Sequence, residues 1–177
     1  MSCHTFSLLS RLAVLPLVLP MVGCSSAGFT SADMVMGLVP PDDFRWANHP
    51  VTLDDPGQLN TRIGPESRQL LKHNWRSSTF GRIASDQAEV ELAVHQLASE
   101  KDAAKVLAEH KYPDAEPLKL GREAYRWLDR AAPQTIFFRR DVYFCQLTID
   151  SHLYQPVLEP MAADLDKLLS RRRLLFW

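Results

Sequence analysis

The sequence of 177 residues is poor in cysteine and glycine and carries almost no net charge. It holds three cysteines and seven glycines, and its formal net charge is −1 at pH 7. The glycines are isolated, which excludes a glycine-rich phosphate loop, and no Gly-x-Ser-x-Gly motif is present to expose a catalytic serine. A nearly neutral chain also lacks the dense basic face that nonspecific nucleic-acid binding requires, so no nucleic acid is expected among its partners.

The six histidines are scattered along the chain. No two of them have the i, i+4 spacing of a zinc-binding helix, and no pair of cysteines is available as ligands. His95 falls on the polar face of a predicted strand, where a solvated side chain is expected rather than a metal ligand. The sequence therefore predicts neither a metal site nor a cofactor.

The longest uncharged apolar stretch lies near the N-terminus, at Leu12–Val22. It is too short to cross a hydrocarbon core of about 30 Å, which needs about 20 apolar residues. Pro16 and Pro20 also oppose a straight membrane-spanning helix. The stretch follows Arg11 and ends in small residues, which is the pattern of a secretory signal peptide.

The residues Met21-Val22-Gly23-Cys24 resemble the lipobox of bacterial lipoproteins, with Met21 where leucine is usual. The resemblance implies a signal peptide at 1–23, a diacylglycerol on the Cys24 thiol, and a flexible tether over 24–40. The protein would then be extracytoplasmic and held to the cell membrane or outer membrane by two or three acyl chains, since one chain binds only marginally. The alternative is an ordinary cleaved signal peptide followed by a chance cysteine.

Removal of the signal peptide leaves Cys24 and Cys145 as the cysteines of the mature chain. Because the resemblance assigns Cys24 to lipid, no intramolecular disulfide is expected. Cys145 lies in the apolar run Val142–Cys145 and is predicted to be a buried small side chain rather than a nucleophile. The exported domain must then rely on its hydrophobic core for stability.

The hydrophobic patterns predict a single α+β domain over 41–177. Alternating apolar residues favour strands, Ser99 with Asp102 forms a variant capping box, and the last helix carries a continuous apolar stripe. The expected elements are a strand at 89–95, a helix at 100–110, strands at 118–128, 134–138 and 142–149, and a helix at 156–172. This order, strand-helix-strand-strand-strand-helix, predicts an antiparallel sheet of about four strands with helices packed on one face. The Pro- and Asp-rich residues 25–66 are expected to be an irregular N-terminal segment, followed by a short helix to about Trp75.

Parts of this pattern also resemble small domains of uncharacterised bacterial envelope lipoproteins. The residues that carry the resemblance are Val90–Leu97, Ala103–Leu107, Leu120-Gly121 and Phe137–Phe144. It covers about half of the chain and implies no chemistry.

Aromatic residues of the predicted hairpin and of the C-terminal tail are the candidates for a partner or ligand surface. Consecutive aromatic residues place rings on both faces of the hairpin, and only one face meets the expected helices. The tail Arg171–Trp177 joins a basic cluster to four apolar residues, which fits either docking on the core or contact with an anionic membrane. The candidate surface comprises Trp127, Phe137, Phe138, Tyr143, Phe144, Phe176 and Trp177.

Three functions remain open at the level of sequence. The first hypothesis is a non-catalytic lipoprotein that binds or scaffolds an envelope protein, because an export signal occurs without a catalytic constellation. The second is a carrier for an apolar ligand held between the aromatic sheet and the last helix. The third is an envelope hydrolase with dispersed residues such as Asp150 and His152. Glu89 and Glu91 share one strand face and fit a cation site or an acid/base pair, although a solvated outer face is the simpler interpretation. No catalytic residue is predicted.

Overall fold

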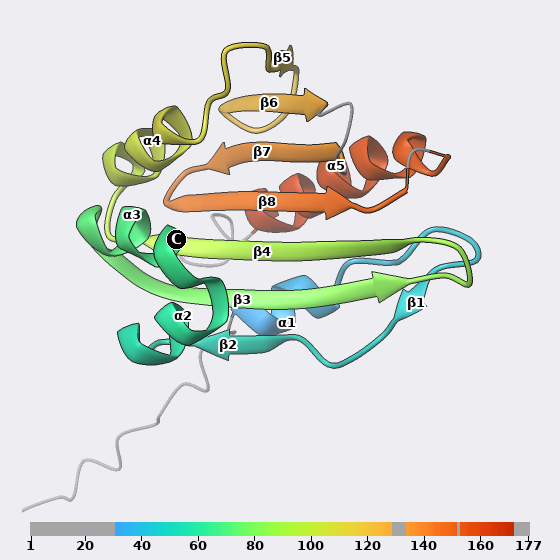
Figure 1. Ribbon diagram of the computed structural model, residues 1–177, viewed down its shortest axis with the longest axis horizontal. Helices are drawn as coiled ribbons and strands as arrows, with labels where there is room; N and C mark the ends of the chain where they lie inside the picture. The colour runs from blue at the N-terminus through green and yellow to red at the C-terminus, as the bar shows by residue number, and fades with distance from the viewer. Residues whose placement is uncertain (1–30, 129–133, 152, 172–177) are drawn as a thin grey trace, which may run out of the picture.

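The computed structural model describes residues 31–128, 134–151 and 153–171 (Figure 1). Within them, eight strands form one antiparallel sheet in the order β1-β3-β4-β8-β7-β6-β5, and β2 pairs with β3 next to β1. The strands are β1 Arg45–Trp46, β2 Val51–Leu53, β3 Trp75–Ala84, β4 Glu89–Leu97, β5 Glu116–Leu118, β6 Glu123–Leu128, β7 Gln134–Arg140 and β8 Tyr143–Ile149.

Helices cover both faces of this sheet. They are α1 Ser31–Met36, α2 Pro56–Ile63, α3 Ser67–Lys72, α4 Glu100–Glu109 and α5 Leu158–Arg171, with 3-10 turns η1 Gly64–Glu66 and η2 Gln155–Val157. α1 and α5 pack on one side, here called the α5 face. α2, α3 and α4 pack on the other side, here called the α4 face, which is turned toward the viewer in Figure 1.

The prediction of about four strands with helices on one face is therefore wrong. β1 and β2 lie in the segment that was expected to be irregular, β3 lies almost wholly in residues to which no element was assigned, and the strand expected at 118–128 is divided into β5 and β6. The aromatic hairpin explains the helices on both faces: Phe138 and Tyr143 enter the core of the α5 face, and Phe137 and Phe144 that of the α4 face. α1 also begins inside the range that was expected to be a tether, and Met34, Val35 and Leu38 are buried.

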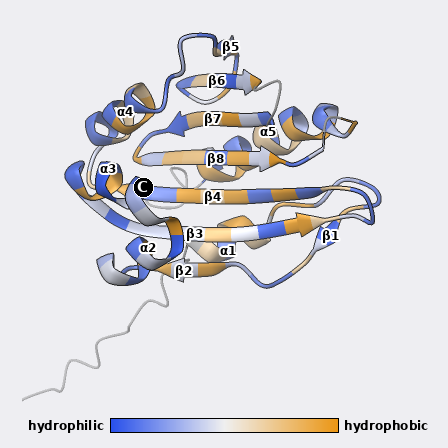
Figure 2. Ribbon diagram, viewed as in Figure 1, coloured by the Kyte–Doolittle hydropathy of each residue, from blue (hydrophilic) through white to orange (hydrophobic). Residues whose placement is uncertain are grey.

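The elements from β4 onward follow the predicted pattern. β4, α4, the β7–β8 hairpin and α5 lie within a few residues of their expected positions. The capping box at the start of α4 is confirmed, since the Asp102 N–H donates to Ser99 Oγ at 3.1 Å. Alternating hydropathy along the central strands is visible in Figure 2.

β3 was missed because its sequence is polar in the middle. Ser78 and Thr79 are fully buried, and their hydroxyls lie 2.6 Å from His95 Nδ1 and 2.8 Å from Thr52 Oγ1. These side-chain contacts satisfy polar groups that would otherwise oppose burial. Gly81 follows them, and a Cβ there would lie 2.7 Å from the Trp46 ring, so the indole packs directly on the backbone of β3.

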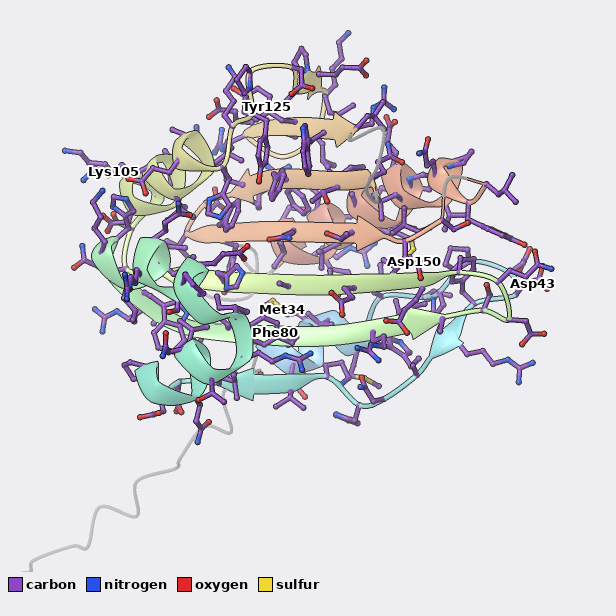
Figure 3. All side chains as sticks on the ribbon, viewed as in Figure 1. Met34, Asp43, Phe80, Lys105, Tyr125 and Asp150 are labelled. Carbon is purple, nitrogen blue, oxygen red and sulfur yellow. The ribbon has the colours of Figure 1, made fainter. Side chains whose placement is uncertain are left out.

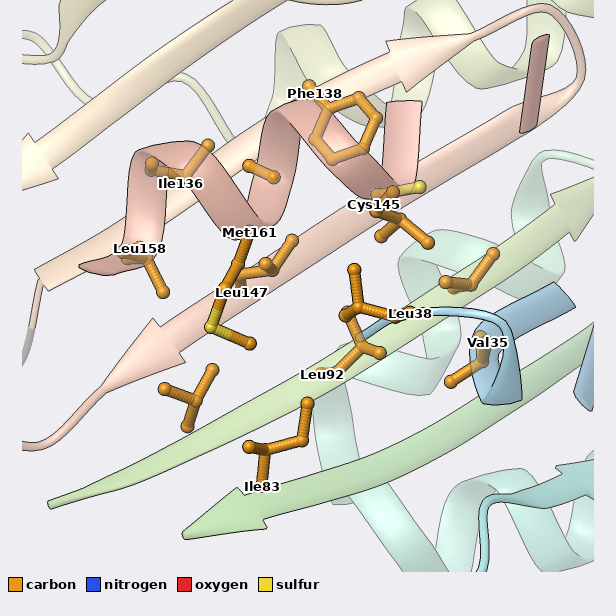
Figure 4. Close-up of a cluster of buried hydrophobic side chains, with 14 of the residues drawn as sticks. Val35, Leu38, Ile83, Leu92, Ile136, Phe138, Cys145, Leu147, Leu158 and Met161 are labelled. Carbon is orange, nitrogen blue, oxygen red and sulfur yellow. The ribbon is translucent and has the colours of Figure 1, made fainter. Parts of the chain in front are cut away.

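The core of the α5 face is filled with apolar side chains (Figure 4). The predicted stripe of α5 is confirmed, with Leu158, Met161, Ala162, Leu165 and Leu169 all buried against the sheet. Cys145 is fully buried there, as predicted, and desolvation raises the pKa of its thiol well above the usual value.

The substitution Gly121→Ala is expected to lower the free energy of unfolding by about 3 kcal/mol. Gly121 has a φ of 60°, and an added Cβ would collide with the Arg139 carbonyl oxygen. Gly57→Ala is the control, because Gly57 lies in the first turn of α2 without a positive φ, and the only atom near its Cβ position is a side-chain oxygen of Asp55. Urea denaturation should show a smaller loss for Gly57→Ala; equal losses would contradict the strained backbone and close approach at Gly121.

Candidate functional site

A cleft opens on the α4 face where the cover provided by α2, α3 and α4 ends. Its volume is about 310 Å³. We call it the histidine cleft, and its lining includes Arg62, Glu66, Phe80, Glu91, Ala93, His95, His110, Phe144, Gln146 and Thr148. In Figure 3, Phe80 lies beside α2 on β3, at this end of the sheet.

The cleft exists because a small residue occupies the middle of its floor. Ala93 on β4 lies between Phe80 on β3 and Gln146 on β8 in the sheet register. Neighbouring strands are about 4.8 Å apart, so the two larger side chains stand on either side of a methyl group. The difference in side-chain size creates the depression.

His95 is buried at one end of this floor and is held in a defined orientation. It is 3% exposed, and its Nδ1 lies 2.6 Å from Ser78 Oγ, which accepts the Trp75 Nε1–H at 2.7 Å. Ser78 Oγ could accept from both rings, but among the described contacts its own proton has no acceptor other than His95 Nδ1. We therefore assign the His95 proton to Nε2. Desolvation, with a smaller contribution from the charge of His110, lowers the pKa of His95 to about 3, so the ring is neutral at physiological pH.

A second imidazole, that of His110, faces the same aromatic ring. His95 stacks on Phe144 at 5.7 Å between ring centroids, and His110, the C-cap of α4, lies 4.8 Å from Phe144. His110 Nδ1 is 2.8 Å from the Val106 carbonyl oxygen and donates to it. Among the described residues, neither imidazole has a hydrogen-bond partner at Nε2.

Charged side chains stand at the rim of the cleft. The Arg62 guanidinium lies 5.4 Å from the centroid of Phe80, and Glu66 follows it on η1. Within the described ranges neither Arg62 nor Glu66 forms an ion pair with another side chain. Glu89 and Glu91 both contact Arg82, at 2.9 and 3.3 Å, and are partly exposed, as expected for a solvated outer face.

The candidate aromatic surface is divided between the two faces of the sheet. Phe144 lines the cleft, and Phe137 packs behind it with 6.2 Å between ring centroids. Trp127 is half-buried and stacks on Tyr112 at 4.1 Å. Phe138 and Tyr143 are buried on the α5 face. Cys24, Phe176 and Trp177 lie outside the described residues.

The dispersed residues considered for hydrolysis are not assembled at the cleft. Asp150 follows β8 at the other end of the sheet, where its Oδ1 accepts the Glu89 N–H at 2.8 Å (Figure 3). His152 lies outside the described residues. Ser78 contacts His95 but is fully buried beneath it. Thr148, the hydroxyl residue of the lining, lies opposite Glu91 in the sheet register, but its Oγ1 is 3.1 Å from Thr135 Oγ1 and no described hydrogen bond joins it to Glu91 or another base.

In the part of the chain that the structure describes, no three His, Cys, Asp or Glu side chains are grouped to hold a metal ion. The helices of that part also include none that is long and apolar enough to cross a membrane.

Comparison of the chain with protein-family models, curated proteins and solved structures finds no match.

Sequence reasoning missed the cleft and misplaced its central residue. His95 was expected to be solvated because it alternates with the apolar residues of β4, whereas α2, α3 and α4 cover this end of the same face. Ala93 was the available signal, since it is a small residue in the middle of that polar face. Arg62 and His110 come from segments whose position over β4 is not encoded in local periodicity.

Proposed function

We propose that this protein is a lipid-anchored extracytoplasmic binding protein whose folded domain holds a small polar ligand in the histidine cleft. The observation that carries the binding role is His95: a buried, oriented imidazole lines a cleft, and its Nε2 has no partner among the described residues. This nitrogen is not among the fully buried unpaired atoms of the described residues, so it is accessible from the cleft to water or a ligand. The lipid anchor follows from the lipobox-like sequence ending at Cys24.

Two observations favour binding of a polar molecule over the other candidate functions. The space between the sheet and α5 is filled by apolar side chains, which disfavours an apolar ligand there (Figure 4). The hydroxyl groups near His95 are buried or bonded to other residues, which disfavours nucleophilic catalysis in the cleft.

Cys24→Ala is expected to abolish acylation and to release the protein from membranes. The full-length chain is expressed in a bacterium with labelled palmitate, and the label and the membrane fraction are measured. Cys3→Ala is the matched control, because position 3 lies in the expected signal peptide and should leave both unchanged. The lipid anchor on Cys24 would be contradicted if the wild-type protein carried no label, or if the Cys24→Ala variant still fractionated with membranes.

Ala93→Leu is expected to remove ligand binding by filling the floor of the cleft. A panel of amino acids, short peptides, sugars and organic acids is screened by thermal unfolding, since a ligand at 100 times its Kd stabilises a protein by about 2.7 kcal/mol. Ala84→Leu is the control: Ala84 lies on β3 on the same face, outside the cleft lining. A stabilising compound should act on wild type and Ala84→Leu but not on Ala93→Leu. A panel without any hit, or a hit retained by Ala93→Leu, would contradict the binding role of the cleft.

A further inference from the structure

We infer that the ligand of the histidine cleft is a short peptide with free ends, whose amide lies between His95 and His110 and whose charged ends meet the rim. This inference rests on the proposed binding function and specifies the chemistry of its ligand.

The two imidazoles offer one donor and one acceptor. The contact with Ser78 leaves His95 with a proton on Nε2, and because His110 Nδ1–H donates to Val106, His110 Nε2 is the acceptor whenever that ring is neutral. Both rings flank Phe144. An amide presents the complementary pair, because its carbonyl accepts from His95 and its N–H donates to His110. A carboxylate only accepts and an ammonium only donates, so each would satisfy one imidazole and leave the other unmatched.

The charges at the rim complement the two ends of a peptide. Arg62 lies over Phe80 without an ion-pair partner among the described residues, and guanidinium groups bind carboxylates in a two-pronged geometry. Glu66 also lines the cleft, has no ion-pair partner among the described residues and carries the opposite charge for an ammonium group, whereas Glu91 is already paired with Arg82. One unpaired cation together with one unpaired anion favours a molecule that carries both charges over a simple anion.

The size of the cleft limits the peptide to a few residues. Its volume of about 310 Å³ is at the lower end of ligand cavities, which span roughly 300 to 1,000 Å³. Ala93 leaves room at the floor for a backbone and not for a bulky ring. A dipeptide of small residues fits these limits.

The test compares glycylglycine with 5-aminopentanoate by isothermal titration of the mature domain. The two molecules have the same chain length and the same charged ends, and only glycylglycine has an amide. We expect 5-aminopentanoate to bind at least tenfold more weakly. The third probe is N-acetylglycinamide, which keeps amide groups and lacks both charges, and it should also bind at least tenfold more weakly than glycylglycine.

Two substitutions assign the contacts. Arg62→Gln should weaken glycylglycine binding about tenfold and leave binding of N-acetylglycinamide unchanged. Arg68→Gln is its control, because Arg68 is exposed on the neighbouring α3 and does not line the cleft. Ala93→Leu should abolish binding of all three probes, and its folding is checked by circular dichroism.

Equal affinity for glycylglycine and 5-aminopentanoate would overturn the amide contact, and an unaltered affinity of Arg62→Gln would overturn the rim contact. If no peptide binds while another compound of the thermal panel does so in the cleft, the inference fails and the proposed function stands. If no compound binds at all, both fail.

Discussion

Replacing Asp166 with asparagine is expected to lower the free energy of unfolding by about 2 to 4 kcal/mol, because a largely buried cation would lose its partner. The Asp166 carboxylate on α5 accepts hydrogen bonds from Nε and Nη2 of Arg140 on β7. It also accepts a hydrogen bond from the Gly121 N–H at 3.2 Å. The side chains of Arg140 and Asp166 are 21% and 13% exposed. The hydrogen bonds that Arg140 donates to Asp166 raise the pKa of the guanidinium. When the carboxylate is removed the guanidinium still stays charged, because an arginine side chain is not deprotonated in proteins.

Urea denaturation of three variants tests this contact. Asp164→Asn is the control on the same helix, because Asp164 pairs with Lys167 at the surface and such pairs contribute roughly 0 to 1 kcal/mol. Replacing both partners with apolar residues, as in Arg140→Met with Asp166→Leu, should recover most of the loss. Equal stability of Asp166→Asn and Asp164→Asn would show that the pair does not hold α5 to the sheet.

Acidification from pH 6.5 to pH 5 is expected to destabilise the protein by about 1.6 kcal/mol through His95 alone, because the slope rises from about 0.7 kcal/mol per pH unit at pH 6.5 toward its limit of about 1.4. The pKa of His95 is lowered to about 3 in the folded protein, against 6.5 in the unfolded chain. Below pH 6.5 the His95 ring is therefore protonated in the unfolded chain but stays neutral in the folded protein. This stability is fully present above pH 6.5 and is lost progressively as the pH falls toward 3.

His95→Gln isolates that contribution. The carboxyl groups of Asp102, Glu109 and Glu123 also have lowered pKa values, chiefly through hydrogen bonds from Ser99, Lys72 and Tyr125. Their contribution is likewise lost on acidification, but only as the pH falls toward their own pKa values, below the window from 6.5 to 5. Unfolding free energies of wild type and His95→Gln are measured at several pH values in that window. The wild type should have the steeper dependence, by about 1.1 kcal/mol per pH unit on average over this window; parallel curves would mean that His95 is accessible to protons in the folded state.

Part of the fold could be predicted because it depends on local patterns. The alternation in β4, the capping box at Ser99 and the apolar stripe of α5 each reflect contacts with one side of a core. β3 has no such local pattern, because Ser78 and Thr79 in its middle are polar. They are buried through contacts of their hydroxyl groups with His95 and Thr52, which are distant in sequence. The same non-local pairing added β1 and β2 to the sheet and made its size unpredictable from periodicity.

The candidate site was less predictable than the fold. One of its histidines, His95, lies on β4, and the other, His110, lies at the end of α4. Its rim comes from two further elements, α2 and η1. No spacing rule joins these segments, because only the packing of the helices on the α4 face brings them together. The aromatic hairpin did carry a usable signal: rings on both of its faces require cover on both sides of the sheet. Of the predicted aromatic surface residues in the described part of the chain, Phe144 is the one that lines the cleft.

The most direct test of the binding role follows the imidazole nitrogens of His95 and His110 by NMR while glycylglycine is added to the mature domain at neutral pH. We expect a neutral His95 with its proton on Nε2 before addition, and saturable shifts of Nε2 in both rings upon addition, absent from Ala93→Leu. A protonated or Nδ1–H form of His95, or nitrogen signals that do not move at concentrations where binding is measured, would contradict it.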